Sequence, residues 1–237
     1  MRNDLIGKRI EDVLGDRQGW IELQDIMGDD LAIVNAARTS YLGESKGDEA
    51  DKKLLNYLMK HRHTTPFEMV EFKFRLHAPL MVIQQWLRHR TYNFNQQSGR
   101  YVPFERNDFY LPQVWRKQSK SNKQASDGEF SSYQSRELTL ALIRHVDEGY
   151  KLYQQALDIG VAKEQARLFL NGFAVCYTLV AKIDAHNLLH FLKLRMDEGA
   201  QWEIRQYANV IWSEFFKEAL PWTAEAAEKY LLTGIDK

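Results

Sequence analysis

The chain has 237 residues, of which 44% are hydrophobic and 12% aromatic, and its 32 Lys and Arg balance its 32 Asp and Glu. This composition excludes a disordered protein, and the zero net charge argues against a dedicated nucleic-acid binder, which usually carries a basic excess. The single cysteine, Cys176, excludes a disulfide framework within the chain and a cysteine-based zinc site. No apolar run approaches the ~20 residues of a membrane span, and no signal peptide is recognisable, so we expect a cytoplasmic protein that does not enter a membrane.

Hydrophobic periodicity predicts the elements of the first third of the chain. In chain order they are a strand over residues 20–26, a helix over 31–40 and a helix over 54–59. A turn is expected at residues 61–68, in which Thr65 and Glu68 have the spacing of a helix capping box.

Apolar and charged side chains alternate over residues 69–77, which predicts an antiparallel strand with one polar face. A helix is expected over 80–90, so that the basic triplet Arg88-His89-Arg90 would lie at its C-terminus. A loop is expected from there to about residue 130. Its part at 117–132 is rich in Ser, Lys, Gln and Asn, and we expect it to be a mobile insertion.

The last part of the chain is predicted to be mostly helical. The expected helices cover residues 135–159, 162–170, 185–196, 202–216 and 221–232, and a buried strand covers 172–183. The helix at 202–216 carries an aromatic stripe that is expected to pack in the core or against another subunit. It consists of Trp202, Tyr207, Trp212, Phe215 and Phe216. Strands without β–α–β alternation indicate an α+β fold, with an antiparallel sheet flanked by long helices in a single domain over residues 1–237.

Four side chains that can carry positive charge lie within thirteen residues, among short polar side chains and a glycine. They are Arg88, His89, Arg90 and Arg100, with Ser98 and Gly99 directly before the last. Guanidinium groups, a hydroxyl group and backbone N–H groups beside a glycine form a typical phosphate site. The residues alone leave a second interpretation open, a solvated basic helix end that the helix dipole favours.

The order of these residues resembles the signature of the flavin-dependent thymidylate synthases. In this chain the signature runs as Arg88-His89-Arg90, seven residues, and then Ser98-Gly99-Arg100-Tyr101. Three further segments resemble the same family and occur in its order. They are His63 to Glu68, Phe191 to Arg195 and Ala200 to Ile204. The resemblance extends over roughly residues 20 to 225.

The resemblance implies a reductive methylation of dUMP at the uracil C5, which yields thymidylate. Methylene-tetrahydrofolate would supply the carbon, and NADPH would supply the reducing equivalents through FAD. The implied fold is a mixed α+β domain that assembles as a homotetramer, with active sites shared between subunits.

Carried over by motif position, two sets of residues would form the site. The FAD would contact or be supported by His63, Thr65, Glu68, Arg88, His89, Arg90, Gln96, Asp184, His186 and His190. The nucleotide would be held by Gln85, Arg88, Gln96, Gln97, Ser98, Gly99, Arg100, Arg167 and Arg195. Arg195 is the expected catalytic residue, because a planar, permanently charged group against the uracil would favour its ionised form.

A protein nucleophile is not expected. Unrelated thymidylate synthases attack the uracil with a cysteine thiolate, whereas Cys176 lies in an apolar run that does not favour a low thiol pKa. We interpret Ser98 as a hydrogen-bond donor to phosphate or substrate, because no His–Asp pair is evident to activate it. The flavin would therefore carry the hydride chemistry while the protein positions and polarises the ring.

Four positions depart from the family pattern. Gln96 stands where Glu is usual and Asn93 where Ser is frequent, while Asp184 and His186 stand where Asn and Arg are common. A histidine near the reduced flavin would stabilise negative charge only when protonated. These departures leave two substrates open: dUMP, and another uridine nucleotide such as UMP in nucleoside biosynthesis.

Two other classes of protein remain possible from the sequence. A metalloenzyme could use His186 and His190, which share a helix face, with His61 and His63, but no acid follows in the His-Glu-x-x-His manner. A single-strand nucleic-acid binder would interleave cations and aromatic rings, as residues 88–101 do, but the zero net charge argues against it. We therefore expect no metal and no nucleic-acid partner.

Overall fold

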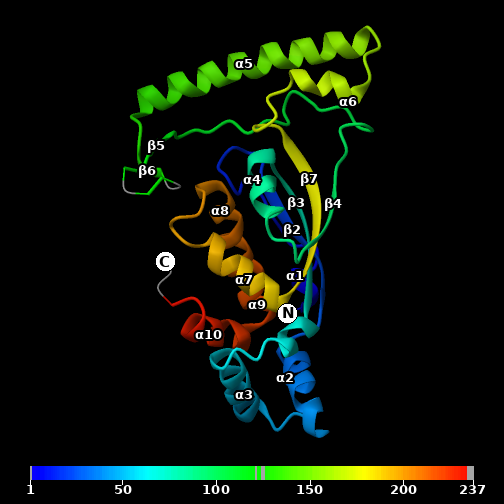
Figure 1. Ribbon diagram of the computed structural model, residues 1–237, viewed down its shortest axis with the longest axis vertical. Coiled ribbons are helices and arrows are strands. Elements are labelled where there is room, and N and C mark those ends of the chain that lie inside the picture. The colour runs from blue at the N-terminus through cyan, green and yellow to red at the C-terminus, as the bar shows by residue number, and fades with distance from the viewer. Residues whose placement is uncertain (1, 121, 124–125, 234–237) are drawn as a thin grey trace.

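A five-stranded antiparallel sheet in the order β1-β2-β3-β7-β4 runs through the protein (Figure 1). The computed structural model describes residues 2–120, 122–123 and 126–233. The strands are β1 (Arg9–Ile10), β2 (Trp20–Met27), β3 (Glu71–Pro79), β7 (Cys176–Asp184) and β4 (Asn93–Gln96). The α+β class with an antiparallel sheet, expected from the sequence, is confirmed.

The central pair of strands is continuous over its whole length. Every residue of β3 pairs with one of β7, from Glu71 opposite Asp184 to Pro79 opposite Cys176. Alternate side chains of the two strands are buried on one face, as the one-sided alternation predicts. They are Phe72, Phe74, Leu76, Leu179 and Ala181. The opposite face carries charged side chains, including the ion pair between Lys182 and Glu71 (2.6 Å).

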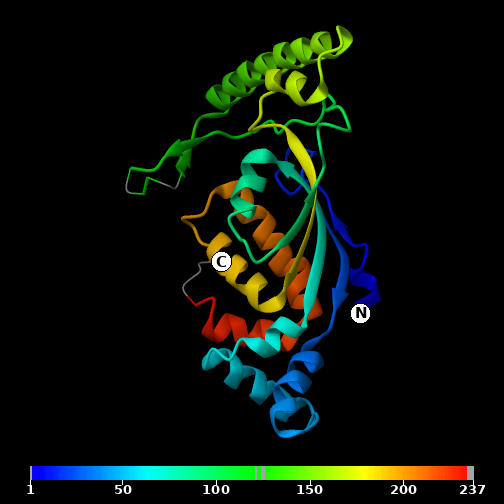
Figure 2. The same cartoon turned by 45° about the vertical axis from the view of Figure 1, so that its right-hand side comes forward.

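Three helices cover the apolar face of the sheet (Figure 2). They are α4 (Leu80–Trp86), α7 (Ala185–Arg195) and α8 (Trp202–Val210). The Trp86 ring stacks 5.1 Å from the Phe191 ring and meets Tyr207 edge-on at 5.9 Å. Aromatic packing therefore joins all three helices at one point.

The helix expected over 202–216 contains a turn that the sequence does not predict. After α8 the chain forms a π-helical turn, Ile211–Phe216, and then α9 (Lys217–Ala219). The rings of Phe215 and Phe216 lie 5.7 Å and 5.6 Å from Phe74 and Phe72 of the sheet. Core packing is confirmed for these two residues of the aromatic stripe, because both rings are fully buried.

The remaining helices lie beyond the two ends of the sheet (Figure 1). One end holds α5 (Ser132–Asp158) and α6 (Lys163–Ala166), and the other holds α2 (Asp30–Arg38), α3 (Asp48–Lys60) and α10 (Pro221–Tyr230). The short α1 (Arg2–Leu5) precedes β1. No helix in the described part of the chain is both long and apolar enough to cross a membrane.

Two expectations about helix ends are wrong. Thr65 and Glu68 form no capping box, because the segment is a 3₁₀ helix, Thr65–Met69, whose preceding residue has helical rather than extended backbone angles. A complete capping box instead starts α5, between Ser131 and Gln134. The helix expected over 162–170 is divided into α6 and a 3₁₀ turn, Arg167–Phe169.

The loop expected up to about residue 130 contains three strands. β4 is short and polar. It is defined by its backbone hydrogen bonds to β7, not by an alternation of apolar side chains. A separate hairpin pairs β5 (Arg116–Gln118) with β6 (Ser126–Glu129). Part of the insertion that the sequence predicts to be mobile, residues 121 and 124–125, lies outside the described residues.

A buried ion pair fixes α2 against α3. Arg38 donates to Asp51 at 2.5 Å, and the two side chains are 5% and 0% exposed. Burial alone would raise the pKa of Asp51, but hydrogen bonds from Ser45 and Arg38 outweigh it and hold the pKa below its ordinary value. The pair also helps to position residues 61–68, because α3 leads directly into them.

Replacing Asp51 with Ala is expected to lower the free energy of unfolding by about 3–5 kcal/mol, because it leaves Arg38 buried without its partner. Urea unfolding measures the loss, with the exposed Lys53→Ala of the same helix as a control that should change stability by less than about 0.5 kcal/mol. Since the folded pKa of Asp51 is lowered, its stabilisation is present above the unfolded pKa of about 3.9 and is lost as the pH falls through the folded pKa. A variant as stable as the wild type would contradict this account.

Candidate functional site

The basic triplet Arg88-His89-Arg90 lies in a turn after α4, not in a helix as expected. The helix ends at Trp86 because the chain must reverse within a few residues to pair Asn93 with Lys182. The backbone N–H of His89 donates to the Trp86 carbonyl at 2.9 Å, which closes the turn. His89 is buried, whereas the two arginines are exposed, so the triplet presents one ring inward and two cations outward.

The buried ring meets Arg195, the last residue of α7. Arg195 Nε donates to His89 Nε2 at 2.8 Å. Its Nη1 donates to Gln85 Oε1 at 3.3 Å, and its Nη2 donates to the Gln85 carbonyl at 3.2 Å. Three residues that the resemblance assigns to the site are therefore in direct contact, although 106 positions separate Arg195 from His89.

Both partners of Arg195 are electrically neutral. Burial, the charge of Arg195 and His190 lower the pKa of His89 to about 4, so its imidazole is uncharged near neutral pH. Burial and the neighbouring Arg88 lower the pKa of Arg195 from its ordinary value. Among the residues that the structure describes, no carboxylate pairs with Arg195. The half-buried guanidinium thus keeps a positive charge that a bound anion can neutralise.

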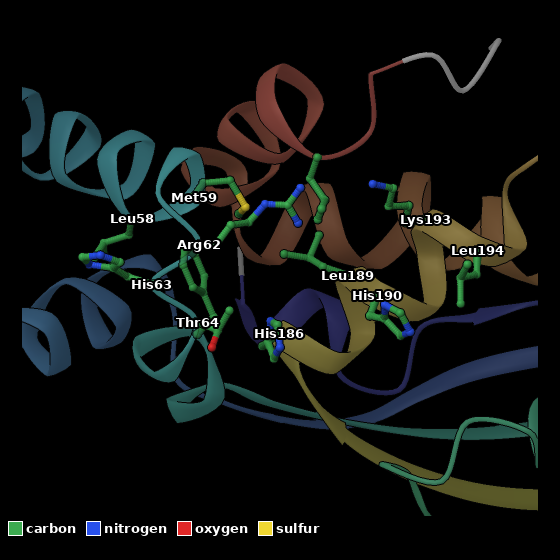
Figure 3. A pocket seen from close by; sticks show the side chains of 12 residues that line it. Leu58, Met59, Arg62, His63, Thr64, His186, Leu189, His190, Lys193 and Leu194 are labelled. Carbon is green, nitrogen blue, oxygen red and sulfur yellow. The ribbon is translucent and has the colours of Figure 1, made fainter.

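A cavity of about 230 Å³ lies between the end of α3 and α7 (Figure 3). Its apolar lining comes from Leu58, Met59, Phe67, Leu189, Leu194 and Leu231. Its polar lining comes from Arg62, His63, Thr64, His186, His190 and Lys193. A lining of apolar side chains with cationic and imidazole groups among them suits a planar heterocycle that carries an anionic group.

Three of the cavity residues, His63, His186 and His190, were expected from the sequence, and two cationic ones were not. Arg62 adjoins His63, and Lys193 lies three residues after His190 on α7. Residues three apart on a helix share a face, so the position of His190 could have predicted that Lys193 lines the same cavity. The His63 ring also packs edge-on against Tyr57 at 5.7 Å.

Other expected flavin residues lie around this cavity with different contacts. Asp184 caps α7, because its carboxylate accepts from the Asn187 backbone N–H at 2.9 Å and from the Asn187 side chain at 2.7 Å. Thr65 and Glu68 are exposed on the adjoining 3₁₀ helix. Across the described ranges, no group of three or more His, Cys, Asp or Glu side chains is arranged to hold a metal ion.

The remaining nucleotide residues lie along the far part of β7. The Gln97 side chain accepts from the Thr178 backbone N–H at 3.1 Å, which fixes the loop that leads to Ser98. Arg100 pairs with Glu164 of α6 at 2.9 Å. Burial raises the pKa of Tyr177, and Arg167 lies close enough to oppose this rise. No hydrogen bond within the described residues joins this second cluster to Arg195.

Comparisons with known proteins agree on one family. The family model described as "Thymidylate synthase complementing protein" matches residues 22–222. A flavin-dependent thymidylate synthase of Thermus thermophilus is 50% identical over 220 residues, which cover 92% of this chain and 78% of that protein. The UMP/dUMP methylase PolB of Streptomyces cacaoi has a similar fold. Its structure bound with 5-Br dUMP superposes with a TM-score of 0.82 at 30% identity, and the match covers 90% of this chain and 95% of that one. Its structure bound with 5-Br UMP gives a TM-score of 0.80 at 31% identity, over 90% of this chain and 94% of that one.

Replacing Gly99 with Ala is expected to destabilise the protein by about 1–3 kcal/mol through overpacking. A Cβ atom at this position would lie 2.5 Å from Cε2 of the buried Phe104, whose backbone N–H is held by the Tyr153 hydroxyl. Thermal unfolding measures the effect. Gly172→Ala is the matched control, because nothing lies within 4 Å of its added Cβ. Equal melting temperatures for the two variants would show that the close approach to Phe104 has no energetic consequence.

Proposed function

Because the chain belongs to the flavin-dependent thymidylate synthase family of methyltransferases, we propose that it converts dUMP to dTMP by reductive methylation at C5. Methylene-tetrahydrofolate supplies the carbon and NADPH supplies a hydride. The C5 hydrogen leaves as a proton, and this proton together with one from solvent restores the two folate N–H bonds that release of the methylene carbon requires. The balanced products are dTMP, tetrahydrofolate and NADP⁺. When bound, FAD would supply the hydride-transfer chemistry that this reduction needs.

The proposal rests mainly on the environment of Arg195. The guanidinium is fixed by His89 and Gln85, and its charge is uncompensated by any carboxylate in the described residues. Such a cation beside the uracil stabilises negative charge on the ring, which raises the electron density at C5. The exposed Arg88 is near enough to lower the pKa of Arg195, and in the proposed complex it would meet a phosphate at the same site.

The cavity between α3 and α7 fits one end of the flavin. His63, His186 and Lys193 would hold the polar groups of the cofactor, while Leu58 and Leu189 would pack against its rings. A cavity of about 230 Å³ is smaller than the about 300–1,000 Å³ that encloses a drug-sized ligand, so the rest of FAD would extend outside it. Residues of another subunit could cover that part.

Assembly into a homotetramer with shared sites is part of the proposal. Two observations support it: the cluster of Arg100 and Arg167 makes no hydrogen bond to Arg195 in the described chain, and α5 exposes large apolar side chains. The exposed side chains are Tyr133, Leu138, Leu140 and Leu152. A second copy that covers α5 would bury these groups and could bring its own Arg167 to the nucleotide.

UMP is the second candidate substrate. The Streptomyces cacaoi relative is a UMP/dUMP methylase with structures bound with 5-Br dUMP and 5-Br UMP. The departures at Gln96, Asp184 and His186 also favour a specialised member of the family.

Methylation assays on the flavin-loaded enzyme test the proposed reaction. Product analysis with NADPH and methylene-tetrahydrofolate is expected to show dTMP from dUMP, at a higher kcat/KM than methylation of UMP. Arg195→Gln, which keeps hydrogen-bonding capacity but removes the charge, is expected to lower kcat by about 10²–10³-fold. A preference for UMP would make UMP, rather than dUMP, the substrate. If neither nucleotide is methylated, the proposed function is refuted.

Hybrid tetramers test the shared site. Arg167→Ala and Arg195→Ala variants are each expected to be inactive alone but to recover part of the activity after they are mixed, unfolded and refolded together. Recovery requires that one subunit supply Arg167 and another supply Arg195 to an intact site. If the mixture stays as inactive as its components while the refolded wild type recovers, each site uses both residues from one chain.

A further inference from the structure

His89 is held in one orientation by the structure around it. Its backbone N–H donates to the Trp86 carbonyl, and its own carbonyl accepts from the Tyr92 N–H at 3.2 Å. Its ring meets the Phe191 ring edge-on at 4.9 Å and the His190 ring at 6.3 Å, both on α7. Its Nε2 therefore points at Arg195 with little freedom to turn elsewhere.

The contact with Arg195 defines the protonation of His89. A guanidinium group offers only donors, so Nε2 must accept the hydrogen bond and the proton of the neutral ring resides on Nδ1. The ionisable groups that face the ring are Arg195 and His190 of α7, and Arg88 lies beside Arg195. Each is a cation or can become one, so all of them oppose a second proton on the ring.

We propose that His89 is a positioning residue, whose neutral imidazole aims the Arg195 guanidinium at a bound nucleotide anion without neutralising it. In the described chain, His89 and Gln85 engage one N–H on each of the three nitrogens of Arg195, which leaves one N–H on each Nη for the ligand. The inference rests on the proposed function for the identity of the ligand. It also changes the role of His89, since the nitrogen that faces Arg195 is not available to FAD.

The residue type follows from this role. A carboxylate at position 89 would bind Arg195 Nε more strongly, but it would cancel much of the charge that the nucleotide has to meet. A neutral acceptor orients the guanidinium and preserves its charge. Gln85 has the same property, because both of its acceptor atoms are amide oxygens.

Nitrogen-15 NMR of the wild-type protein, with labelled histidine, tests the contact directly. The expected spectrum assigns the His89 proton to Nδ1, leaves Nε2 unprotonated, and keeps the ring neutral down to about pH 4. A proton on Nε2 at neutral pH, in either a neutral or a charged ring, would overturn the proposal. This measurement needs no variant and no bound cofactor.

Nucleotide binding to the flavin-free protein tests the consequence. His89→Phe keeps the ring contact with Phe191 but removes the acceptor, and dUMP affinity is expected to fall about 10–100-fold. His89→Gln restores an acceptor and should recover most of the affinity, whereas His89→Glu should restore the hydrogen bond yet weaken dUMP binding. The exposed Lys53→Ala of α3 is the control and should bind as the wild type does.

The outcomes separate this inference from the proposed function. Wild-type affinity in His89→Phe, or no recovery in His89→Gln when both variants melt like the wild type, would refute the positioning role. If the wild-type protein itself binds neither dUMP nor UMP, the proposed function fails, and the NMR spectrum still decides whether His89 accepts from Arg195. If His89→Phe does not fold, the comparison between His89→Gln and His89→Glu carries the test.

Discussion

The pairing of β3 with β7 sets the geometry of the whole molecule. The two strands pair over all nine positions, and a helix follows each of them without a loop, α4 after Pro79 and α7 after Asp184. Because the strands are antiparallel, the two helices start at opposite ends of the pair and run toward each other over the same apolar face. Trp86 and Phe191 meet where they cross, and this contact brings the end of α4 against the end of α7. A one-residue slip would turn the apolar face outward, so burial of the core and placement of Arg195 depend on the same register.

The site gains its chemical character from what surrounds Arg195. A guanidinium held by a carboxylate would be strongly oriented but largely neutralised, as Arg38 is by Asp51 elsewhere in this chain. Arg195 instead has an imidazole and an amide as partners, and it remains half-buried. Arg38 and Arg195 thus differ in the charge of their partners. The charge of Arg38 is met within the fold, whereas in the proposed function the charge of Arg195 is met by a bound anion.

The sequence predicted those parts of the fold that depend on local patterns. The alternation over 69–77 located β3 to within two residues, because one face of the strand is buried and the other is not. β4 was missed because its pairing with β7 depends on backbone groups, which leave no side-chain pattern. The role of Asp184 could not be assigned either, since an aspartate before a helix suits both a cap and a ligand contact. The hydrogen bond between His89 and Arg195 joins residues 106 positions apart, and no periodicity relates them.

In the proposed reaction, the uncompensated charge of Arg195 polarises the uracil ring. The ionisation of N3–H in nucleotide bound to the flavin-free protein tests it most directly, because that proton reports the charge at the ring before any hydride is transferred. The pH at which bound dUMP loses this proton, followed by NMR, should lie below that of free dUMP in the wild type. In Arg195→Gln the same pH should return toward the value for the free nucleotide. Equal ionisation of bound dUMP in the two proteins would contradict the account.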